Sequence, residues 1–192
     1  MKPVRLILVM TENKKIPPPE FRTNGTLAEK GVLIAEQSSI DALTSRGYGT
    51  QEEKVFTLSF FEALYLANKG MLEVKDKKGK TVDFQGLLRC YEALNENAWV
   101  SYMVYRDLRS RGYVAREGFG GGIDFRVYER GGYGKDTAPY LVFSIQEGKP
   151  LGIDQLADAL RQCQSQKKEM VIAVMNRRGE IVYYSLSQLT FK

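Results

Sequence analysis

The segment IDFRVYER, residues 123–130, places a tyrosine among charged side chains in a pattern typical of a strand. Successive side chains of a strand point to opposite faces, so the apolar residues of this segment share one face. The other face carries Asp124, Arg126, Tyr128 and Arg130. This alternation fits two interpretations, a phosphate-contacting surface around Tyr128 or a solvated strand face that holds an amphipathic tyrosine.

The absence of histidine limits the chemistry that this chain can perform. Its 192 residues contain none, and imidazole is the commonest general acid and base near neutral pH and the commonest metal ligand. Catalytic dyads and triads built on histidine are therefore excluded. The two cysteines, Cys90 and Cys163, lie far apart without the spacing of a zinc site or a disulfide framework. We expect reduced, buried thiols, no metal site and no cofactor.

A second group of residues has the order of a metal-dependent nuclease site. Asp124 is followed by Glu147 and Lys149, the acid and acid-x-lysine arrangement that can hold a divalent ion beside a phosphate. However, the alternation of the preceding strand would bury Glu147 and Lys149, while Gly148 and Pro150 end that strand. We favour a surface turn here, with a metal-dependent endonuclease as the alternative.

Basic side chains indicate a polyanionic partner. The formal net charge is +5, and six arginines fall between residues 106 and 130, diluted by four acids. Arginine suits bidentate phosphate contacts. Two further cations, Lys167 and Lys168, follow a predicted helix, where capping is the favoured interpretation. The glycine-rich GFGGG at 118–122 lacks the residues of a nucleotide-binding loop, so it predicts a turn.

Capping signals locate the helices of the first half. A helix over 38–47 begins at a serine and ends at a glycine, and a helix over 59–70 has a capping box of Ser59 and Glu62. The other elements expected there are strands at 4–10 and 31–37, a hairpin over 71–84 with the turn DKKG, and a helix over 84–94.

A polar break, NEN at 95–97, marks the boundary that we predict between an N-terminal domain, 1–95, and a C-terminal domain, 96–192. A helix over 98–112 follows. The remaining elements expected are strands at 113–117, 123–130, 140–145, 170–175 and 181–189 and a helix at 153–163. In that helix the apolar residues Ile153, Leu156, Ala157 and Leu160 predict a face that covers a sheet.

The fold class predicted is α/β (α+β), with a small N-terminal α/β domain and a C-terminal mixed sheet with packed helices. The longest apolar runs, LILVM and MVIAVM, are far shorter than the roughly 18 residues of a membrane span, and the N-terminus lacks a signal-peptide cleavage pattern. We therefore expect a cytoplasmic protein with no membrane partner.

Residues 57–186 resemble the archaeal tRNA-splicing endonucleases. The resemblance is carried by LSFFEALYLANKGMLEV, then VYRDLRSRGYVAREGFGGGIDFRVYERGG, APYLVF and SQKKEMVIAVMNRRGEIVYY, in the order and spacing of the family. It implies a nuclease-like C-terminal domain and precursor tRNA as the substrate. It also implies metal-free cleavage, in which a 2′-hydroxyl attacks its own phosphate.

The resemblance also assigns candidate catalytic positions. The family uses a tyrosine as proposed base, a histidine as acid and a lysine that stabilises the transition state; these match Tyr128, Thr137 and Lys168. The acid is thus missing. Because a positioned general acid contributes roughly 10²- to 10⁴-fold in rate, we expect this chain alone to be nearly inert, with Tyr128 and Lys168 vestigial.

Some members of the family pair an active chain with one that lacks the catalytic set, and this chain resembles the second kind. The resemblance implies a structural subunit of an α2β2 heterotetramer that contacts RNA through Arg126, Arg130 and Lys135. The interface residues expected, on a loop usually acidic in the family and on the final strand, are Arg177, Arg178, Glu180, Tyr183 and Leu186. The alternatives are a slow tyrosine–lysine nuclease and a basic RNA-binding module without an endonuclease partner.

Overall fold

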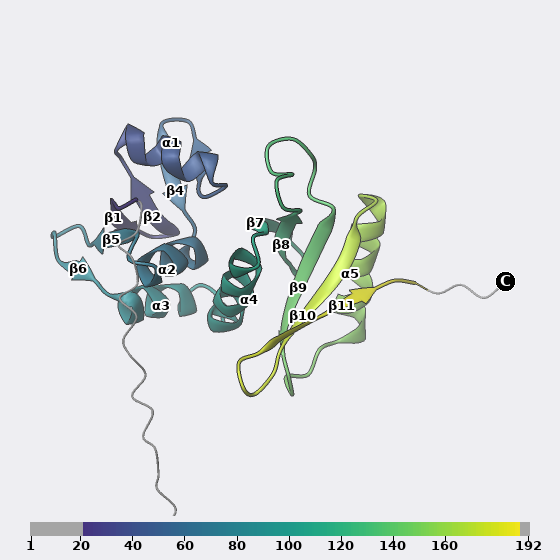
Figure 1. Ribbon diagram of the computed structural model, residues 1–192. Coiled ribbons are helices and arrows are strands. Elements are labelled where there is room, and N and C mark those ends of the chain that lie inside the picture. Colours follow the sequence, from purple (N-terminus) through teal and green to yellow (C-terminus); the bar gives the residue numbers. More distant parts are fainter. Residues whose placement is uncertain (1–20, 189–192) are drawn as a thin grey trace, which may run out of the picture.

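The computed structural model describes residues 21–188, and within that range the chain forms two mixed sheets and five helices (Figure 1). The predicted α/β class, with a C-terminal mixed sheet and packed helices, is confirmed. The strand expected at 4–10 lies outside the described residues. No helix in the described part of the chain is long and apolar enough to cross a membrane.

The N-terminal sheet has the order β3-β4-β2-β1-β5-β6. Its strands are β1 (Thr23–Ala28), β2 (Gly31–Ile34), β3 (Thr50–Glu52), β4 (Val55–Leu58), β5 (Leu72–Lys75) and β6 (Thr81–Val82). The β1–β5 pair is parallel and the other pairs are antiparallel. Strand β2 confirms the strand predicted to begin at residue 31, and the β5–β6 pair confirms the hairpin predicted over 71–84. Strands β1, β3 and β4 were not predicted. The sequences of β1 and β3 are largely polar, and the four residues of β4 are too few to show a clear alternation.

Three helices accompany this sheet: α1 (Gln37–Ser45), α2 (Phe60–Asn68) and α3 (Phe84–Glu92). The serine cap predicted for α1 is wrong. Its N-cap is Glu36, whose carboxylate accepts hydrogen bonds from the hydroxyls of Ser38 and Ser39, both at 2.8 Å. The predicted capping box of α2 is supported by the Glu62 carboxylate, which accepts a hydrogen bond from the Ser59 amide at 3.0 Å.

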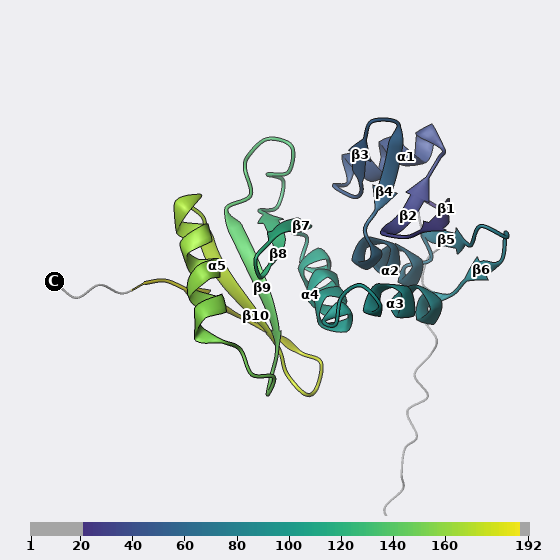
Figure 2. The same cartoon turned by 180° about the vertical axis from the view of Figure 1, so that it is seen from behind.

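The C-terminal sheet has the order β11-β10-β9-β8-β7. Its strands are β7 (Val114–Gly120), β8 (Ile123–Tyr128), β9 (Tyr140–Gln146), β10 (Glu169–Met175) and β11 (Ile181–Leu186). The β9–β10 pair is parallel, so its strands are joined by a crossover helix, α5 (Ile153–Ser165). The sheet lies between α5 on one face and α4 (Ala98–Ser110) on the other (Figures 1 and 2).

Helix α4 joins the two halves of the molecule through one continuous apolar core. It packs on α2 and α3 and on the C-terminal sheet. Phe61 of α2 illustrates the continuity, because its ring centroid lies 4.8 Å from that of Tyr105 in α4 and 5.2 Å from that of Phe125 in β8. The domain boundary at residues 95–96 stays a prediction.

The apolar face predicted for α5 is partly wrong. The side chains that pack against the sheet are Leu156, Ala159, Leu160 and Cys163. These positions follow the i, i+3, i+4, i+7 spacing of one helical stripe. Ala157 falls outside this stripe, and Ile153, in the first turn, is 75% exposed.

Candidate functional site

Tyr128 and Thr137 line one pocket at the end of β8. The pocket has a volume of about 230 Å³ and is otherwise formed by the loop that leads to β9. Tyr128 is partly buried, and its ring packs edge-to-face on Tyr133 with the centroids 5.0 Å apart. Thr137 is exposed. The structure thus brings together two of the three positions that the sequence singled out.

Lys168, in the connection between α5 and β10, contacts the same loop through its side chain. Its amide donates a hydrogen bond to the Cys163 carbonyl at 3.0 Å, and Lys167 adopts a left-handed conformation with φ 54°. The backbone therefore caps α5. The predicted capping by the cation itself is wrong for Lys168, because its ammonium donates to the carbonyl of Ala138, the neighbour of Thr137.

The loop between β8 and β9 therefore brings together Tyr128, Thr137 and Lys168. These three side chains differ in what they can contribute to a reaction. A lysine ammonium can stabilise a negatively charged phosphate, and a tyrosine can donate or accept a hydrogen bond. A threonine hydroxyl can also form hydrogen bonds, but it is a poor proton donor for a leaving group at neutral pH. The arrangement can hold a phosphate, but it contains no imidazole, the commonest general acid near neutral pH.

The three basic residues predicted to contact RNA lie on different surfaces. Arg126 donates from Nε to the Glu117 carbonyl at 2.8 Å, and its guanidinium lies 4.7 Å from the ring centroid of Phe119. Lys135 is exposed on the loop after β8. The alternation predicted that Arg130 shares the face of Tyr128. This prediction is wrong, because β8 ends at Tyr128. Arg130 lies instead over Tyr113, beside the opposite face of the sheet.

The predicted interface loop is a tight turn between β10 and β11. The side-chain oxygen of Asn176 accepts hydrogen bonds from the amides of Arg178 and Glu180, at 2.9 and 3.0 Å. The Arg177 amide donates to the Glu147 carboxylate at 3.1 Å. Arg177, Arg178 and Glu180 are exposed.

The two interface residues predicted on β11 contact the chain's own core. Tyr183 is partly buried, and its hydroxyl donates to the Asp107 carboxylate at 2.8 Å. Leu186 packs partly buried against the cluster beneath α5. The large apolar side chains that β11 exposes are instead Val182 and Tyr184, at 43% and 56%.

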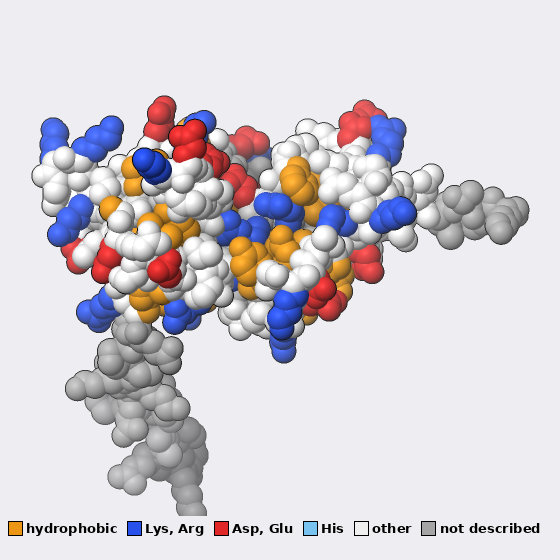
Figure 3. Space-filling view, turned by 90° about the horizontal axis from the view of Figure 1, so that it is seen from above, with side chains coloured by type: hydrophobic (Ala, Val, Ile, Leu, Met, Phe, Trp, Pro, Cys, Tyr) orange, Lys and Arg blue, Asp and Glu red, His pale blue; other side chains and the backbone are white. Residues whose placement is uncertain are grey.

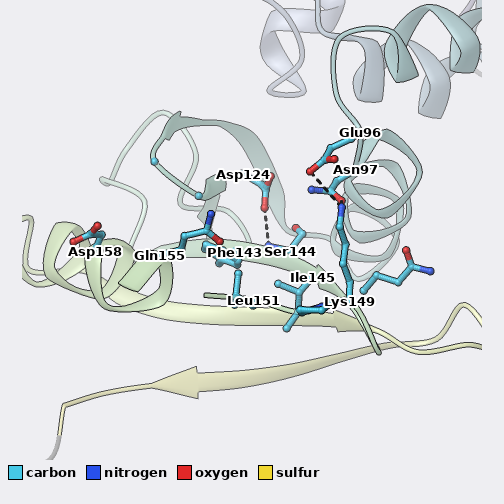
Figure 4. A pocket seen from close by; sticks show the side chains of 14 residues that line it. Glu96, Asn97, Asp124, Phe143, Ser144, Ile145, Lys149, Leu151, Gln155 and Asp158 are labelled. Atoms are coloured by element: carbon cyan, nitrogen blue, oxygen red, sulfur yellow. Dashed lines mark hydrogen bonds and ion pairs between the residues drawn. The ribbon is translucent and has the colours of Figure 1, made fainter. Parts of the chain in front are cut away.

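Asp124 lines a larger pocket of about 580 Å³ between α4, β9 and α5 (Figure 4). Its carboxylate accepts a hydrogen bond from the Ser144 amide at 2.6 Å. Burial raises the pKa of Asp124 to about 6, although the hydrogen bond from the Ser144 amide acts in the opposite direction. Asp124 is thus a partly buried acid that links β8 to β9.

The acid and acid-x-lysine set is not assembled. Lys149 lines the same pocket as Asp124, but its ammonium is engaged by Asn97 at 2.9 Å and by Glu96 at 3.3 Å (Figure 4). Glu147 does not line this pocket and turns to the β10–β11 turn. Across residues 21–188, no three acidic, cysteine or histidine side chains form a group that could hold a metal ion.

Sequence reasoning missed a buried ion pair between the two halves. Arg116 of β7 lies 2.9 Å from Glu62 of α2, and their side chains are only 11% and 4% exposed. The guanidinium also donates to the carbonyls of Gly47 and Gly49. The signal was an acid in the otherwise apolar run FFEALYL, where a charge implies a buried partner.

The fold and the loop site define a class of protein, a two-part α/β chain with a nuclease-like C-terminal domain. Residues 98–183 match the family model of the tRNA intron endonuclease catalytic C-terminal domain, and residues 23–88 match that of the N-terminal domain. This chain belongs to the archaeal tRNA-splicing endonuclease family.

Similar proteins cover most of the chain. The tRNA-splicing endonuclease of Methanococcus vannielii is 35% identical over 163 residues, which is 85% of this chain and 92% of the relative. That of Pyrococcus horikoshii is 30% identical over 83% of this chain and 92% of the relative. The Methanococcoides burtonii protein of the same name is 30% identical over 85% of this chain but only 46% of its own length.

Proposed function

We propose that this chain is a structural, RNA-binding subunit of a tRNA-splicing endonuclease and that it requires an active partner subunit to cut precursor tRNA. The family acts on precursor tRNA. The observation that carries the proposal is the complete lack of histidine in a family whose chemistry uses one. Thr137 lies in the pocket of Tyr128, where the resemblance expects the acid.

Energetics support an inactive chain. A positioned general acid contributes roughly 10²- to 10⁴-fold in rate, equivalent to roughly 3–5 kcal/mol of barrier. Lys168 is engaged with the Ala138 carbonyl, and it stabilises negative charge without supplying a proton at the required rate. Tyr128 and Lys168 then serve the loop's structure and the contact with RNA.

The charge of the chain supports the RNA-holding role. The net charge is +5. Lys135 is exposed on the loop after β8, and Arg130 is exposed over Tyr113. Lys and Arg side chains lie beside hydrophobic side chains in the middle of the face shown in Figure 3, between the N- and C-terminal parts. Cations that contact phosphates position RNA without reading its sequence. In an α2β2 assembly the active chains then supply the two cutting sites.

The experiment incubates an intron-containing precursor tRNA with this chain, with a catalytic-type subunit, and with both, in the presence of a metal chelator. We expect cleavage only in the mixture. Cleavage by this chain alone would overturn the proposal, and a parallel series with magnesium identifies any metal-dependent activity. Failure of the mixture to assemble or to cut would favour an RNA-binding module without an endonuclease partner.

A further inference from the structure

A separate pocket of about 300 Å³ opens between the C-terminal part of α4 and the adjacent face of the sheet. Its floor is aliphatic. Its polar lining consists of Arg111, Tyr113, Arg130, Tyr140 and Tyr183. Pockets of this size hold small organic molecules, and a few polar groups in an apolar lining fix the ligand's orientation.

Both arginines lie over tyrosine rings. The Arg130 guanidinium is 5.6 Å from the ring centroid of Tyr113, and that of Arg111 is 5.6 Å from the centroid of Tyr183. Arg111 is also paired with Asp107 at 2.7 Å. No carboxylate within residues 21–188 forms an ion pair with Arg130, so its charge is available to an anion.

Two of the tyrosine rings are held by carboxylates. The Tyr183 hydroxyl donates to Asp107 at 2.8 Å, and the Tyr140 hydroxyl donates to Glu129 at 3.1 Å. Burial and the bond to Asp107 raise the pKa of Tyr183, so the phenol stays neutral and keeps its donor role. Flat apolar surfaces that are fixed before binding lose little entropy when a ligand stacks on them.

The pocket adjoins the loop site. Glu129, which orients Tyr140 at the rim of the pocket, also lines the pocket of Tyr128 and Thr137. The two pockets therefore share the segment around Glu129. A flexible chain with a phosphate beside Tyr128 could place its neighbouring unit over Arg130.

We propose that the Arg111–Tyr113–Arg130–Tyr140–Tyr183 pocket binds one unpaired nucleotide of the precursor RNA. The base stacks on the tyrosine and guanidinium planes, and the phosphate pairs with Arg130. Aromatic rings and guanidinium planes are the usual platforms for splayed bases in single-stranded RNA. This inference rests on the proposed function and specifies the form of RNA that the chain holds.

Charge and shape favour a nucleotide over a side chain of a protein partner. An acidic side chain could pair with Arg130, but it would leave the aromatic faces without a stacking partner. A nucleotide satisfies both parts of the pocket, because it joins a flat ring to an anion. Docking of a partner protein is therefore an outcome that the test must separate.

The test measures binding of a single-stranded oligoribonucleotide of about eight units, a length typical of one module, to the full chain at several salt concentrations. Tyr113→Leu removes the stacking plane and should weaken binding about tenfold. Tyr113→Phe keeps the plane and should bind like the parent. Arg130→Gln should weaken binding and reduce the slope of log affinity against log salt by about one.

Arg89→Gln provides the matched control, because this substitution removes the same charge and Arg89 is exposed on α3 and does not line the pocket. Unchanged RNA binding in both Tyr113→Leu and Arg130→Gln would overturn the inference. So would loss of assembly with the catalytic subunit at unchanged RNA affinity, which would identify a protein site. If Tyr113→Leu fails to fold, the salt dependence of RNA binding by Arg130→Gln tests the inference, and a slope equal to that of the parent would overturn it. The proposed function is tested separately, by cleavage in the unmutated mixture.

Discussion

At the scale of single residues, the proposed function depends on Thr137, the position where the resemblance expects the catalytic acid. Thr137 shares a pocket with Tyr128, and Lys168 holds the adjacent Ala138 carbonyl. A phosphate placed there would meet a positive charge and two hydroxyls. It would not meet a group that can protonate a leaving oxygen near neutral pH.

Restoring an imidazole should therefore restore activity. We expect Thr137→His to cut precursor tRNA roughly 10²- to 10⁴-fold faster than the parent chain, measured as a single-turnover rate with a metal chelator. Thr137→Val is the control and should remain inert. Adding Tyr128→Phe to Thr137→His should remove the gain; a gain that survives this change would refute the assigned roles.

Asp124 should make the chain less stable as the pH rises. Burial raises its pKa to about 6, above the ordinary value of about 3.9, so between these values the folded state binds more protons than the unfolded state. Its contribution to stability is present below about pH 4 and is lost as the pH rises to about 6. The loss is about 2–3 kcal/mol.

Asp124→Asn should remove this dependence while its side-chain oxygen still accepts the Ser144 amide. Urea unfolding at pH 4 and pH 7 measures the change in the free energy of unfolding. The decrease between the two pH values should be about 2–3 kcal/mol smaller than in the parent. Asp136→Asn, which removes an exposed carboxylate, controls for net charge. Equal decreases in Asp124→Asn and the parent would show that Asp124 is not responsible.

Residue-level prediction from sequence succeeded where a regular element continued and failed where it ended. Alternation correctly separated Tyr128 from the apolar face of β8, with a burial pattern that alternates along the strand. The same alternation misplaced Arg130, two residues beyond the end of the strand. Lys168 shows a further limit, because its contact with Ala138 depends on a loop that no local pattern specifies.

At the scale of elements, the Glu62–Arg116 ion pair links α2 to β7. The pair is almost fully buried, and Glu62 also accepts hydrogen bonds from the amides of Gly49 and Ser59. A buried charge that loses its partner is costly, whereas removing both charges together can be nearly neutral.

Arg116→Met should therefore lower the free energy of unfolding by about 3–5 kcal/mol, measured by urea denaturation. The double variant Arg116→Met with Glu62→Gln should recover part of that loss. Arg161→Met is a matched control, because Arg161 pairs with Asp158 on the surface and should lose less than about 1 kcal/mol. Equal losses for Arg116→Met and Arg161→Met would contradict a coupling between the two elements.

Elements with strong local signals could be predicted, and those defined by pairing could not. Helices α2 and α3 and the β5–β6 hairpin carry capping and turn residues in sequence. Strands β1 and β3 lack such signals, and β1 is held by parallel pairing with the distant β5. The stripe on α5 was partly misassigned because helical spacing alone admitted Ile153, at the exposed start of the helix.

At the scale of the whole molecule, the β10–β11 turn presents two exposed arginines that are available to a partner chain. Arg177 and Arg178 follow Asn176, whose side chain accepts the turn amides. The β5–β6 turn has the same hydrogen-bond pattern, because the Asp76 carboxylate accepts hydrogen bonds from the amides of Lys78 and Lys80. The side chains of Lys77 and Lys78 are exposed there. The two turns therefore offer a matched comparison.

We expect the double reversal Arg177→Glu with Arg178→Glu to weaken association with the catalytic subunit about tenfold, because a partner surface that accepts two arginines would repel two glutamates. Lys77→Glu with Lys78→Glu should leave association within about twofold. Native mass spectrometry and sedimentation measure both. Equal effects of the two reversals would mean that only net charge matters and that the β10–β11 turn is not an interface.

The central claim is that the reacting groups of the assembly belong to the partner. The most direct measurement is the single-turnover cleavage rate of the mixed assembly at saturating precursor tRNA, with Tyr128→Phe in this chain or the equivalent tyrosine changed in the partner. We predict a rate within about twofold of the parent in the first case and a loss of roughly 10²-fold or more in the second. A comparable loss when only Tyr128 is changed would contradict the claim and make this chain a catalytic subunit.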